Sequence, residues 1–499
     1  MKFAFLYLFI MMVQGLEREP AIFDMRFNVP QVNRFLKSGA FDGFFYPNQF
    51  WNWHKDLLLN KKNRKVVSRR VTIGHSFEGR KIDGFYMTND TAKIDLYKNT
   101  KNIIFFTGLH HSREPLSVTM IMLMVIEILK NYQKEEHSLM KELFRDNIIF
   151  FVPMLNIDSY TFITRMHQTR QLTEDIKMIR KNRNIHPSCT IESGGVDLNR
   201  NYDYKFGLDN KGSSDNPCQE DYRGPEPFSE PETKAIKHYV DTHKNIVSCV
   251  NIHSYGNAWI YPFNFVHDGS DHLLNVKRPL FGQFYEQFKQ EMQDKGHKAF
   301  YGNAAFVLDY AANGEAGDWY AGAKNILNID VELGDTSKDS DRFYVRRELI
   351  PKIVRYNWIV MKEYLKKHTV TFSLKSIIIN KAEPVVTFEI LNNSISSLIH
   401  MLGIVKPLFK DEEEIKYNME YGVKALITDH ITHTDVIGNQ IPLTFKGRHI
   451  LELSIFFETF IDMQKLHALE FLVKRNEVNY LSYPDQKYLF RLKQFLKNK

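Results

Sequence analysis

The stretch Ile103-Ile104-Phe105-Phe106-Thr107-Gly108-Leu109-His110-His111-Ser112-Arg113-Glu114 joins an apolar run to a polar cluster. The apolar run, residues 103–106, predicts a buried strand. Behind the glycine that ends it, His111 and Glu114 stand three residues apart. Both residue types are common ligands of a catalytic zinc ion, which takes three protein ligands and leaves one position open. We therefore expect a strand that ends at part of a metal site, if a third ligand follows another strand.

Further apolar runs and amphipathic segments alternate with this strand. Buried strands are expected at Ile148–Val152, Ile246–Ile252 and Leu327–Val331, and helices at Leu116–Tyr132, Glu230–Thr242, Pro279–Gly296 and Asp341–His368. Such alternation predicts an α/β fold with a mixed, mostly parallel sheet flanked by helices. In these sheets the active site lies outside the carboxyl ends of the strands, so the residues at each strand end are the candidates for function.

The chain divides into four expected segments. Lys2 precedes an almost entirely apolar run at 3–13, which is typical of a secretory signal peptide cleaved near Gly15. About 12 apolar residues are too few to span a bilayer, which needs about 20. The expected segments are a signal peptide at 1–15, an N-terminal segment at 16–45, an α/β domain at 46–367 and a β-rich accessory domain at 368–499.

The composition limits the kinds of partner. The 499 residues carry a formal net charge of +7 without a long basic run, which gives no indication of nucleic-acid binding. After the first 15 residues, no segment is long and apolar enough to predict a transmembrane helix. We expect a soluble monomer.

The three cysteines predict one disulfide. Cys189 and Cys218 lie in loop-like sequence beside prolines, which suits a surface disulfide. Cys249 lies inside an apolar run, where a free cysteine behaves as a small hydrophobic residue. An odd number of cysteines in an oxidising compartment fits one bridge and one buried thiol.

Two more residues of the metal-binding or acid/base type occupy predicted strand ends. His253 follows the run at 246–252, and Glu332 follows the run at 327–331. A single histidine beside a strand is more often structural than a ligand. Together with His111 and Glu114, however, these residues predict one site at the carboxyl edge of the sheet.

At this point the chain resembles the metallocarboxypeptidases of the carboxypeptidase A/B type. His111-Ser112-Arg113-Glu114, followed 139 residues after Glu114 by His253-Ser254-Tyr255, is similar to their zinc site. Gly195-Val196-Asp197-Leu198-Asn199-Arg200-Asn201 matches a family segment, and Asp318-Trp319 precedes Glu332 at the family's spacing. The resemblance spans roughly residues 46–367, so that segment is expected to be the catalytic domain.

The resemblance implies a role for each matching residue. His111, Glu114 and His253 would hold one Zn²⁺, with His110 as a rival ligand that the His-x-x-Glu spacing disfavours. Glu332 would take a proton from the attacking water and pass it to the leaving amine.

Substrate-binding roles are implied in the same way. Arg180 would stabilise the oxyanion, with Arg183 as its nearest competitor. Asn199 and Arg200 would bind the terminal carboxylate of the substrate, and Arg113 would extend the positive field. Tyr310, nine residues before Trp319, would close over the substrate.

The specificity pocket departs from the familiar subtypes. Gly317 occupies the position where an aspartate would imply basic C-terminal residues and an aliphatic residue would imply apolar ones. A glycine predicts a roomy, uncharged floor and favours large neutral or aromatic residues. Glu315 nearby favours lysine or arginine instead.

The implied function is that of a zinc exopeptidase acting on peptides and proteins with a free C-terminus, either secreted from the cell or within a digestive vacuole or lysosome. Two alternatives remain: a related zinc deacylase acting on small N-acyl amino acids, and a secreted peptide-binding pseudoenzyme that works through its β-rich domain.

Overall fold

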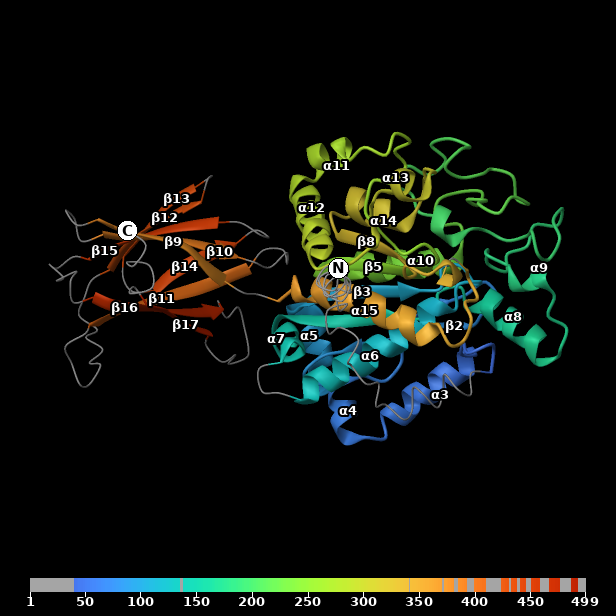
Figure 1. Ribbon diagram of the computed structural model, residues 1–499, viewed down its shortest axis with the longest axis horizontal. Coiled ribbons are helices and arrows are strands. Elements are labelled where there is room, and N and C mark those ends of the chain that lie inside the picture. Colours follow the sequence, from blue (N-terminus) through green and yellow to red (C-terminus); the bar gives the residue numbers. More distant parts are fainter. Residues whose placement is uncertain are drawn as a thin grey trace, which may run out of the picture.

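The computed structural model describes residues 40–134, 138–340 and 342–369, together with nine strands between residues 372 and 491 (Figure 1). The expected signal peptide lies outside the described residues, as does most of the segment at 16–45. The helices of the α/β domain are α3 Pro47–Leu57, α4 Lys61–Val66, α5 Ile94–Thr100, α6 Leu116–Lys134, α7 Leu139–Asp146, α8 Ile157–Gln168, α9 Glu174–Lys177, α10 Pro231–Thr242, α11 His272–Lys277, α12 Pro279–Asp294, α13 Ala304–Leu308, α14 Ala316–Asp318 and α15 Ile350–Lys366.

The centre of this domain is a mixed eight-stranded sheet. Its strands are β1 Val71–His75, β2 Lys81–Met87, β3 Asn102–Gly108, β4 Asn147–Val152, β5 Ile246–Ser254, β6 Ala258–Ile260, β7 Phe300–Gly302 and β8 Leu327–Leu333. They are ordered β1-β2-β4-β3-β5-β8-β6-β7. The four central strands β4, β3, β5 and β8 are parallel, whereas β1, β2 and β6 join antiparallel neighbours. The expected mixed, mostly parallel sheet is confirmed.

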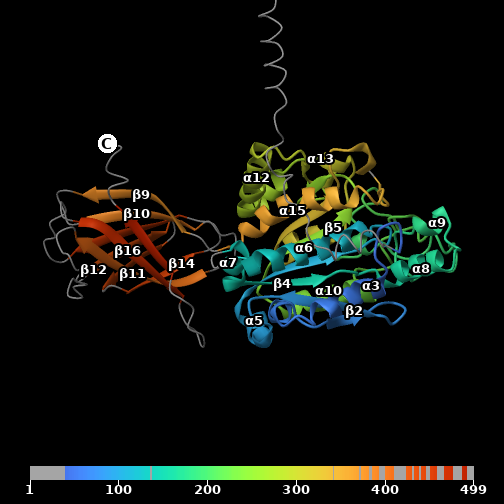
Figure 2. The same ribbon diagram turned by 60° about the horizontal axis from the view of Figure 1, so that its bottom comes forward.

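Helices cover both faces of this sheet. Side chains alternate between the two faces of a strand, so strands buried on both sides are almost continuously apolar. Ile104 and Phe106 of β3 pack into a core that includes α6, α12 and α15. Ile103 and Phe105 pack on the opposite face, in a core that includes α10 and the turn at Trp319–Ala323. Figure 2 shows α6 and α15 on one side of the sheet and α10 on the other.

The four predicted strands are the four central ones, and the four predicted helices correspond to α6, α10, α12 and α15. The largest error concerns α15, which begins at Ile350 instead of Asp341. Pro351 lies in its first turn, where the missing N–H is harmless. A helix that began nine residues earlier would place that proline in its interior, where the ring clashes with the preceding turn.

Helix α6 is apolar over most of its length. Its segment at 116–133 is long and apolar enough to cross a membrane, which the sequence did not lead us to expect. However, 72% of this segment is buried within the fold, where it packs against α15, β3 and β5. Its composition therefore fits a core helix.

The β-rich segment contains two antiparallel sheets. Their strands are β9 Phe372–Asn380, β10 Val385–Asn392, β11 Ile399–Phe409, β12 Val423–Asp429, β13 Thr432–Ile437, β14 Gln440–Phe445, β15 Ile450–Phe457, β16 Leu466–Arg475 and β17 Gln486–Arg491. One sheet has the order β13-β12-β15-β10-β9, and the other has the order β14-β11-β16-β17.

Candidate active site

The candidate site lies at the carboxyl ends of three central strands. His111 and Glu114 belong to the loop between β3 and α6, His253 is the penultimate residue of β5, and Glu332 is the penultimate residue of β8. His253 and Glu332 are directly paired across β5 and β8. The sheet therefore brings together residues that are more than 200 positions apart in sequence.

The loop after β3 starts with a close approach of two backbones. A β-carbon at Gly108 would lie 2.8 Å from the carbonyl oxygen of Pro153, so this position requires glycine. Leu109 then takes a left-handed conformation with φ 58° and turns the chain out of the strand. This turn places His111 and Glu114 above the sheet edge.

Three side chains converge in a buried cluster. His111 Nδ1 lies 2.8 Å from Glu114 Oε1, and His253 Nδ1 lies 2.9 Å from Glu114 Oε2. The two Nδ1 atoms are 3.2 Å apart. None of the three residues is more than 3% exposed. Candidate ligand atoms of all three lie within 4.8 Å of one another.

This donor set fits a zinc ion. Zn–N distances of about 2.0–2.1 Å give a tetrahedral site N···N edges of about 3.3 Å, close to the separation of the two Nδ1 atoms. Two imidazoles and one carboxylate are a common three-ligand set of catalytic zinc. The Nδ1 atoms of His111 and His253 and the carboxylate of Glu114 are thus close enough together to bind one cation.

Asp197 connects this cluster to an arginine. Its Oδ1 lies 3.1 Å from His111 Nε2, the ring nitrogen that faces away from the cluster. Its Oδ2 accepts a hydrogen bond from Arg180 Nε at 2.9 Å, and Arg180 Nη2 is equally close. Burial alone would raise the pKa of Asp197, but Arg180 and His111 hold it well below its usual range. No role of Asp197 was predicted from the sequence.

Glu332 faces the same cluster. Burial and the nearby Glu114 raise the pKa of Glu332 well above its ordinary value, while Arg180, Arg113 and Arg200 act in the opposite direction. The Cβ of Glu332 lies 3.3 Å from where a β-carbon at Gly256 would be, so this glycine leaves room for the carboxylate. Glu332 is therefore held beside the candidate metal ligands.

Two alternatives from the sequence, His110 and Arg183, are not among the three clustered ligands or the partners of Asp197. His110 Nε2 lies 3.1 Å from the Tyr202 hydroxyl, and the His110 ring stacks on His253 with a centroid distance of 5.3 Å. Arg183 pairs with Glu78 at 3.3 Å and lies over the ring of Phe162. Neither joins the cluster around Glu114 and Asp197.

The residues expected to bind a terminal carboxylate lie close to a short helix, α14. Arg200 is 5% exposed; it donates to the carbonyl oxygens of Gly212 through Nε and Asn199 through Nη1. Asn199 Oδ1 accepts from the Ala316 N–H at 3.1 Å. These hydrogen bonds hold the Asn199 and Arg200 side chains in place. Arg200 Nη2 takes part in none of them.

Arg113 and Tyr310 lie nearer the surface. Arg113 forms an ion pair with Glu220 and lies 4.1 Å from the ring centroid of Phe343. Tyr310 is 48% exposed. Burial of the hydroxyl end raises the pKa of Tyr310, and the charges of Arg200 and Glu332 also affect it. The phenol is thus within electrostatic reach of both the carboxylate-binding residues and Glu332.

The surroundings of Gly317 differ from the expected roomy, uncharged floor. A β-carbon at Gly317 would lie 2.4 Å from Asn328 Nδ2, 2.8 Å from Asp330 Oδ2 and 3.0 Å from Glu315 Oε1. The glycine is needed because polar side chains already fill this space. Glu315, the residue before α14, was already indicated by the local sequence, whereas Asn328 and Asp330 come from β8 and are not revealed by the sequence around Gly317.

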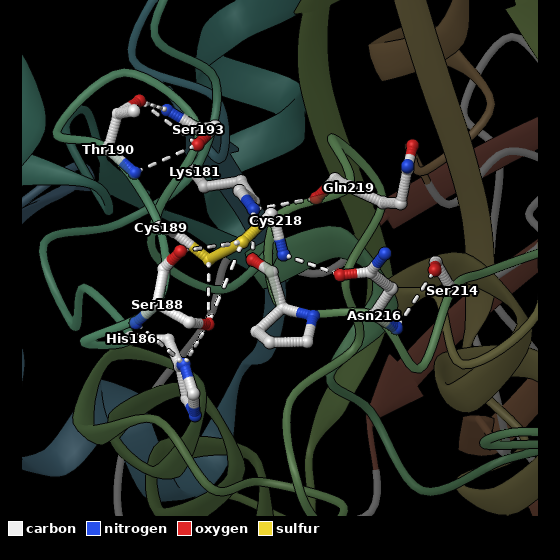
Figure 3. Close-up of a disulfide and its surroundings, with 11 residues drawn as sticks. Lys181, His186, Ser188, Cys189, Thr190, Ser193, Ser214, Asn216, Cys218 and Gln219 are labelled. Carbon is white, nitrogen blue, oxygen red and sulfur yellow. Dashed lines mark hydrogen bonds between the residues drawn. A yellow bond between two sulfur atoms is a disulfide. The ribbon is translucent and has the colours of Figure 1, made fainter.

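The expected disulfide between Cys189 and Cys218 is present, and Cys249 is free and buried (Figure 3). The bridge joins two loops next to the site. Lys181, which follows Arg180, donates to the carbonyl oxygens of Pro217 and Gln219 on either side of Cys218. The bridge therefore ties the loop that carries Arg180 to the segment that contains Glu220.

Replacing both Cys189 and Cys218 by serine should lower the free energy of unfolding by about 3 kcal/mol, because the bridge closes a chain segment with a sequence separation of 29. Denaturant unfolding of the two proteins measures this difference. Reductant should destabilise the native protein to a similar extent but leave the double variant unchanged. If reductant destabilised both proteins equally, the disulfide between Cys189 and Cys218 would not be the source of the effect, and its stabilising role would be contradicted.

Comparison with known proteins agrees with this fold and site. The sequence profile of the family Peptidase_M14, described as zinc carboxypeptidase, matches residues 57–360. Carboxypeptidase A5 of Macaca fascicularis is 27% identical over 308 residues, which cover 62% of this chain and 64% of the relative. Carboxypeptidase B of Canis lupus familiaris is 31% identical over 285 residues, which cover 56% of this chain and 61% of the relative. The chain belongs to the zinc carboxypeptidase family.

Solved structures support the fold independently. Bovine thrombin-activatable fibrinolysis inhibitor, in complex with tick carboxypeptidase inhibitor, matches with a TM-score of 0.50 and 21% identity over 66% of this chain and 98% of that one. At this identity the likeness concerns the fold alone. Because the chain spans less than two thirds of the length of the carboxypeptidases A5 and B it matches, activity and substrates are argued separately below.

Proposed function

We propose that the protein is a zinc-dependent carboxypeptidase, which hydrolyses the C-terminal peptide bond of peptides and proteins. One observation carries the proposal. The buried triad of His111, Glu114 and His253 stands beside Glu332, which is paired with His253 across β5 and β8. Family membership supports the same reaction.

His111, Glu114 and His253 would hold the zinc ion. When bound, the metal acts as a Lewis acid that polarises the scissile carbonyl and lowers the pKa of a coordinated water. Asp197 fixes the orientation of the His111 ring through Nε2, and this kind of carboxylate contact also raises the basicity of a ligating histidine.

Glu332 performs the proton transfers. It accepts a proton from the attacking water and delivers it to the nitrogen of the departing residue. A raised pKa suits both steps, because the carboxyl group must take up the proton and hold it until the C–N bond breaks. Arg180, oriented by Asp197, offers its guanidinium to the negative charge that develops on the carbonyl oxygen.

The remaining residues select a free C-terminus. The Arg200 guanidinium and the Asn199 side chain provide donors for the terminal carboxylate, to which a planar guanidinium binds with directional hydrogen bonds. Arg113 adds positive charge at the outer edge, and Tyr310 closes over the bound residue. The Asn199 contact with Ala316 holds this carboxylate site beside α14.

Hydrolysis of matched peptides tests the proposal. A peptide with a free C-terminus should lose its last residue, and the same peptide with a C-terminal amide should be cleaved about 30- to 5,000-fold more slowly, because truncating a buried charge-paired contact costs about 2–5 kcal/mol. Mass spectrometry of the products distinguishes the outcomes. Equal cleavage of the amidated peptide would reject the exopeptidase assignment. Release of an N-acyl group alone would favour the zinc deacylase. Binding of the peptide without cleavage would favour the pseudoenzyme.

The disulfide supports an oxidising compartment, because such bridges form and persist mainly in secreted or lumenal proteins. We propose that the protein acts outside the cell or within a digestive vacuole or lysosome. We also propose that residues 368–499 form a separate accessory domain. Fractionation of the producing cells with an antibody to the chain tests the location.

A further inference from the structure

A buried asparagine, Asn182, lies two residues after Arg180 in the loop that follows α9, and only 1% of it is exposed. Its backbone N–H donates to the carbonyl oxygen of Val196 at 3.0 Å, and its Oδ1 accepts from the Val196 N–H at 2.9 Å. Val196 directly precedes Asp197, which contacts both His111 and Arg180. Asn182 therefore connects the loop of Arg180 to the segment of Asp197.

These two segments leave no room for a side chain between them. A β-carbon at Gly195 would lie 2.1 Å from the carbonyl oxygen of Asn182, and Gly195 has a φ of 92°, which favours glycine. The carbonyl oxygen of Arg180 is held separately, by the Ser112 N–H and by Asn156 Nδ2, at 3.2 Å each. The Arg180 backbone thus has one anchor at its own carbonyl group and a second one at Asn182.

Two buried carboxyl groups, Glu230 and Glu232, hold this second anchor. Asn182 Nδ2 donates to Glu230 Oε2 at 2.7 Å and to Glu232 Oε2 at 3.2 Å. Both glutamates are fully buried. The other oxygen of Glu232 accepts from the backbone N–H of Phe77 at 3.0 Å. An amide nitrogen carries two N–H groups, so each member of this carboxyl pair receives one of them.

No cation balances the carboxyl pair. Within the described ranges, no lysine or arginine forms an ion pair with either member, because the guanidinium groups on neighbouring elements are engaged by other carboxylates. Arg80, on the turn after β1, pairs with Asp158 of α8 at 2.8 Å. Arg183, on the loop of Asn182, pairs with Glu78 at 3.3 Å. Burial raises the pKa of Tyr222, which also lies near the pair, so this phenol stays neutral.

Glu232 consequently keeps its proton more readily than an ordinary carboxyl group. Burial, with a contribution from Glu230, raises the pKa of Glu232 from 4.5 to about 7. Below this pH the neutral group accepts the Asn182 N–H beside Glu230 without repulsion. Above it, two buried negative charges would share one amide, which is unfavourable. Because the pKa is raised on folding, this contribution to stability is present at acid pH and is lost as the pH rises through about 7.

We propose that Glu232 is a positioning residue, which acts through Asn182 on the orientation of Arg180; the inference rests on the proposed carboxypeptidase activity. The connection runs from the Glu232 carboxyl group to the Asn182 amide, and from there to the segments that carry Arg180 and Asp197. A small movement of Asn182 displaces the Arg180 guanidinium from the oxygen on which negative charge develops. A misplacement of about 1 Å can cost about 100-fold in rate.

The variant Asn182→Ala breaks this connection. Its kcat on a peptide with a free C-terminus should fall by about 100-fold. In an Arg180→Ala background the same change should lower kcat by no more than about twofold, since the group that Asn182 positions is already absent. Equal losses in the two backgrounds would overturn the inference, because Asn182 would then act on something other than Arg180.

Asn147→Ala is the matched control. Asn147 is an equally buried amide at the start of β4, where it donates to the carbonyl oxygens of Leu143 and His368. This variant should keep the native kcat. A loss as large as that of Asn182→Ala would overturn the inference, because removal of any buried amide would then suffice.

Glu232→Gln provides a second test if Asn182→Ala does not fold. Glutamine has nearly the same shape and cannot ionise. The kcat of this variant should be within about twofold of the native value at about pH 6 and about tenfold higher at about pH 8, where only about one tenth of Glu232 keeps its proton. Identical pH profiles would overturn the inference and leave the carboxypeptidase intact. If the native protein released no C-terminal residue, the proposed function itself would be rejected.

Discussion

Glu332→Gln should lower kcat by about 10²–10⁴-fold while zinc content and peptide binding stay close to those of the native protein. Glutamine has nearly the same shape but cannot take a proton from the attacking water. Glu332 is also not one of the three clustered ligands, so its replacement should not release the metal. Steady-state kinetics, metal analysis and calorimetric titration with an uncleaved peptide measure the three quantities separately.

The control for this variant is Glu286→Gln. Glu286 lies on α12 and pairs with Lys289 at 3.4 Å, so the replacement removes one carboxylate without touching the site. Its kinetics should match those of the native protein. If the kcat of Glu332→Gln is reduced by no more than about tenfold, the loss is smaller than that expected on removal of a general base. This result would exclude the proposed role of Glu332.

The central strands of the fold could be predicted from the sequence because buried strands give a strong hydrophobic signal. Strands β3 and β4 are buried on both faces and contain continuous apolar runs, whereas β5 and β8 are equally buried but include polar residues among the apolar ones. Strands β6 and β7 were missed because they have three residues each, too few to show any period. Edge strand β1 has no buried residue, so it carries no hydrophobic pattern.

The same reasoning explains what could be anticipated about the site. His253 and Glu332 follow apolar runs, and the rule for parallel sheets makes strand ends meet. Asp197 lies in a loop and reaches His111 only through tertiary structure. Asp330 did carry a local signal: it is a charged residue in a buried strand, where Asn328, Asp330 and Glu332 alternate with apolar residues. Such a residue requires partners, which only the paired strand identifies.

Asp197→Asn should weaken zinc binding by about 10–100-fold, the usual effect of losing the carboxylate partner of a ligating histidine. One oxygen of Asp197 accepts from His111 Nε2, and the other accepts from Arg180. An amide has a single oxygen, so one of these two donors must face an NH₂ group. Either the His111 ring or the Arg180 guanidinium loses its orientation, and kcat should fall together with metal affinity.

A loss of stability alone would not produce this pattern, and Asp158→Asn provides the comparison. Asp158 is equally buried and pairs with Arg80 at 2.8 Å, but it lies outside the site. Asp197→Asn leaves Arg180, whose side chain is 14% exposed, without this counter-charge, which costs about 3–5 kcal/mol. Asp158→Asn should cost less, because the Arg80 side chain is 40% exposed and keeps its ion pair with Glu78. Only Asp197→Asn should also alter zinc affinity, measured by competition with a chelator. A residue that positions His111 and Arg180 must affect zinc binding or catalysis when it is replaced. If both variants keep native zinc affinity and native kcat, Asp197 therefore stabilises the fold and has no role in the reaction.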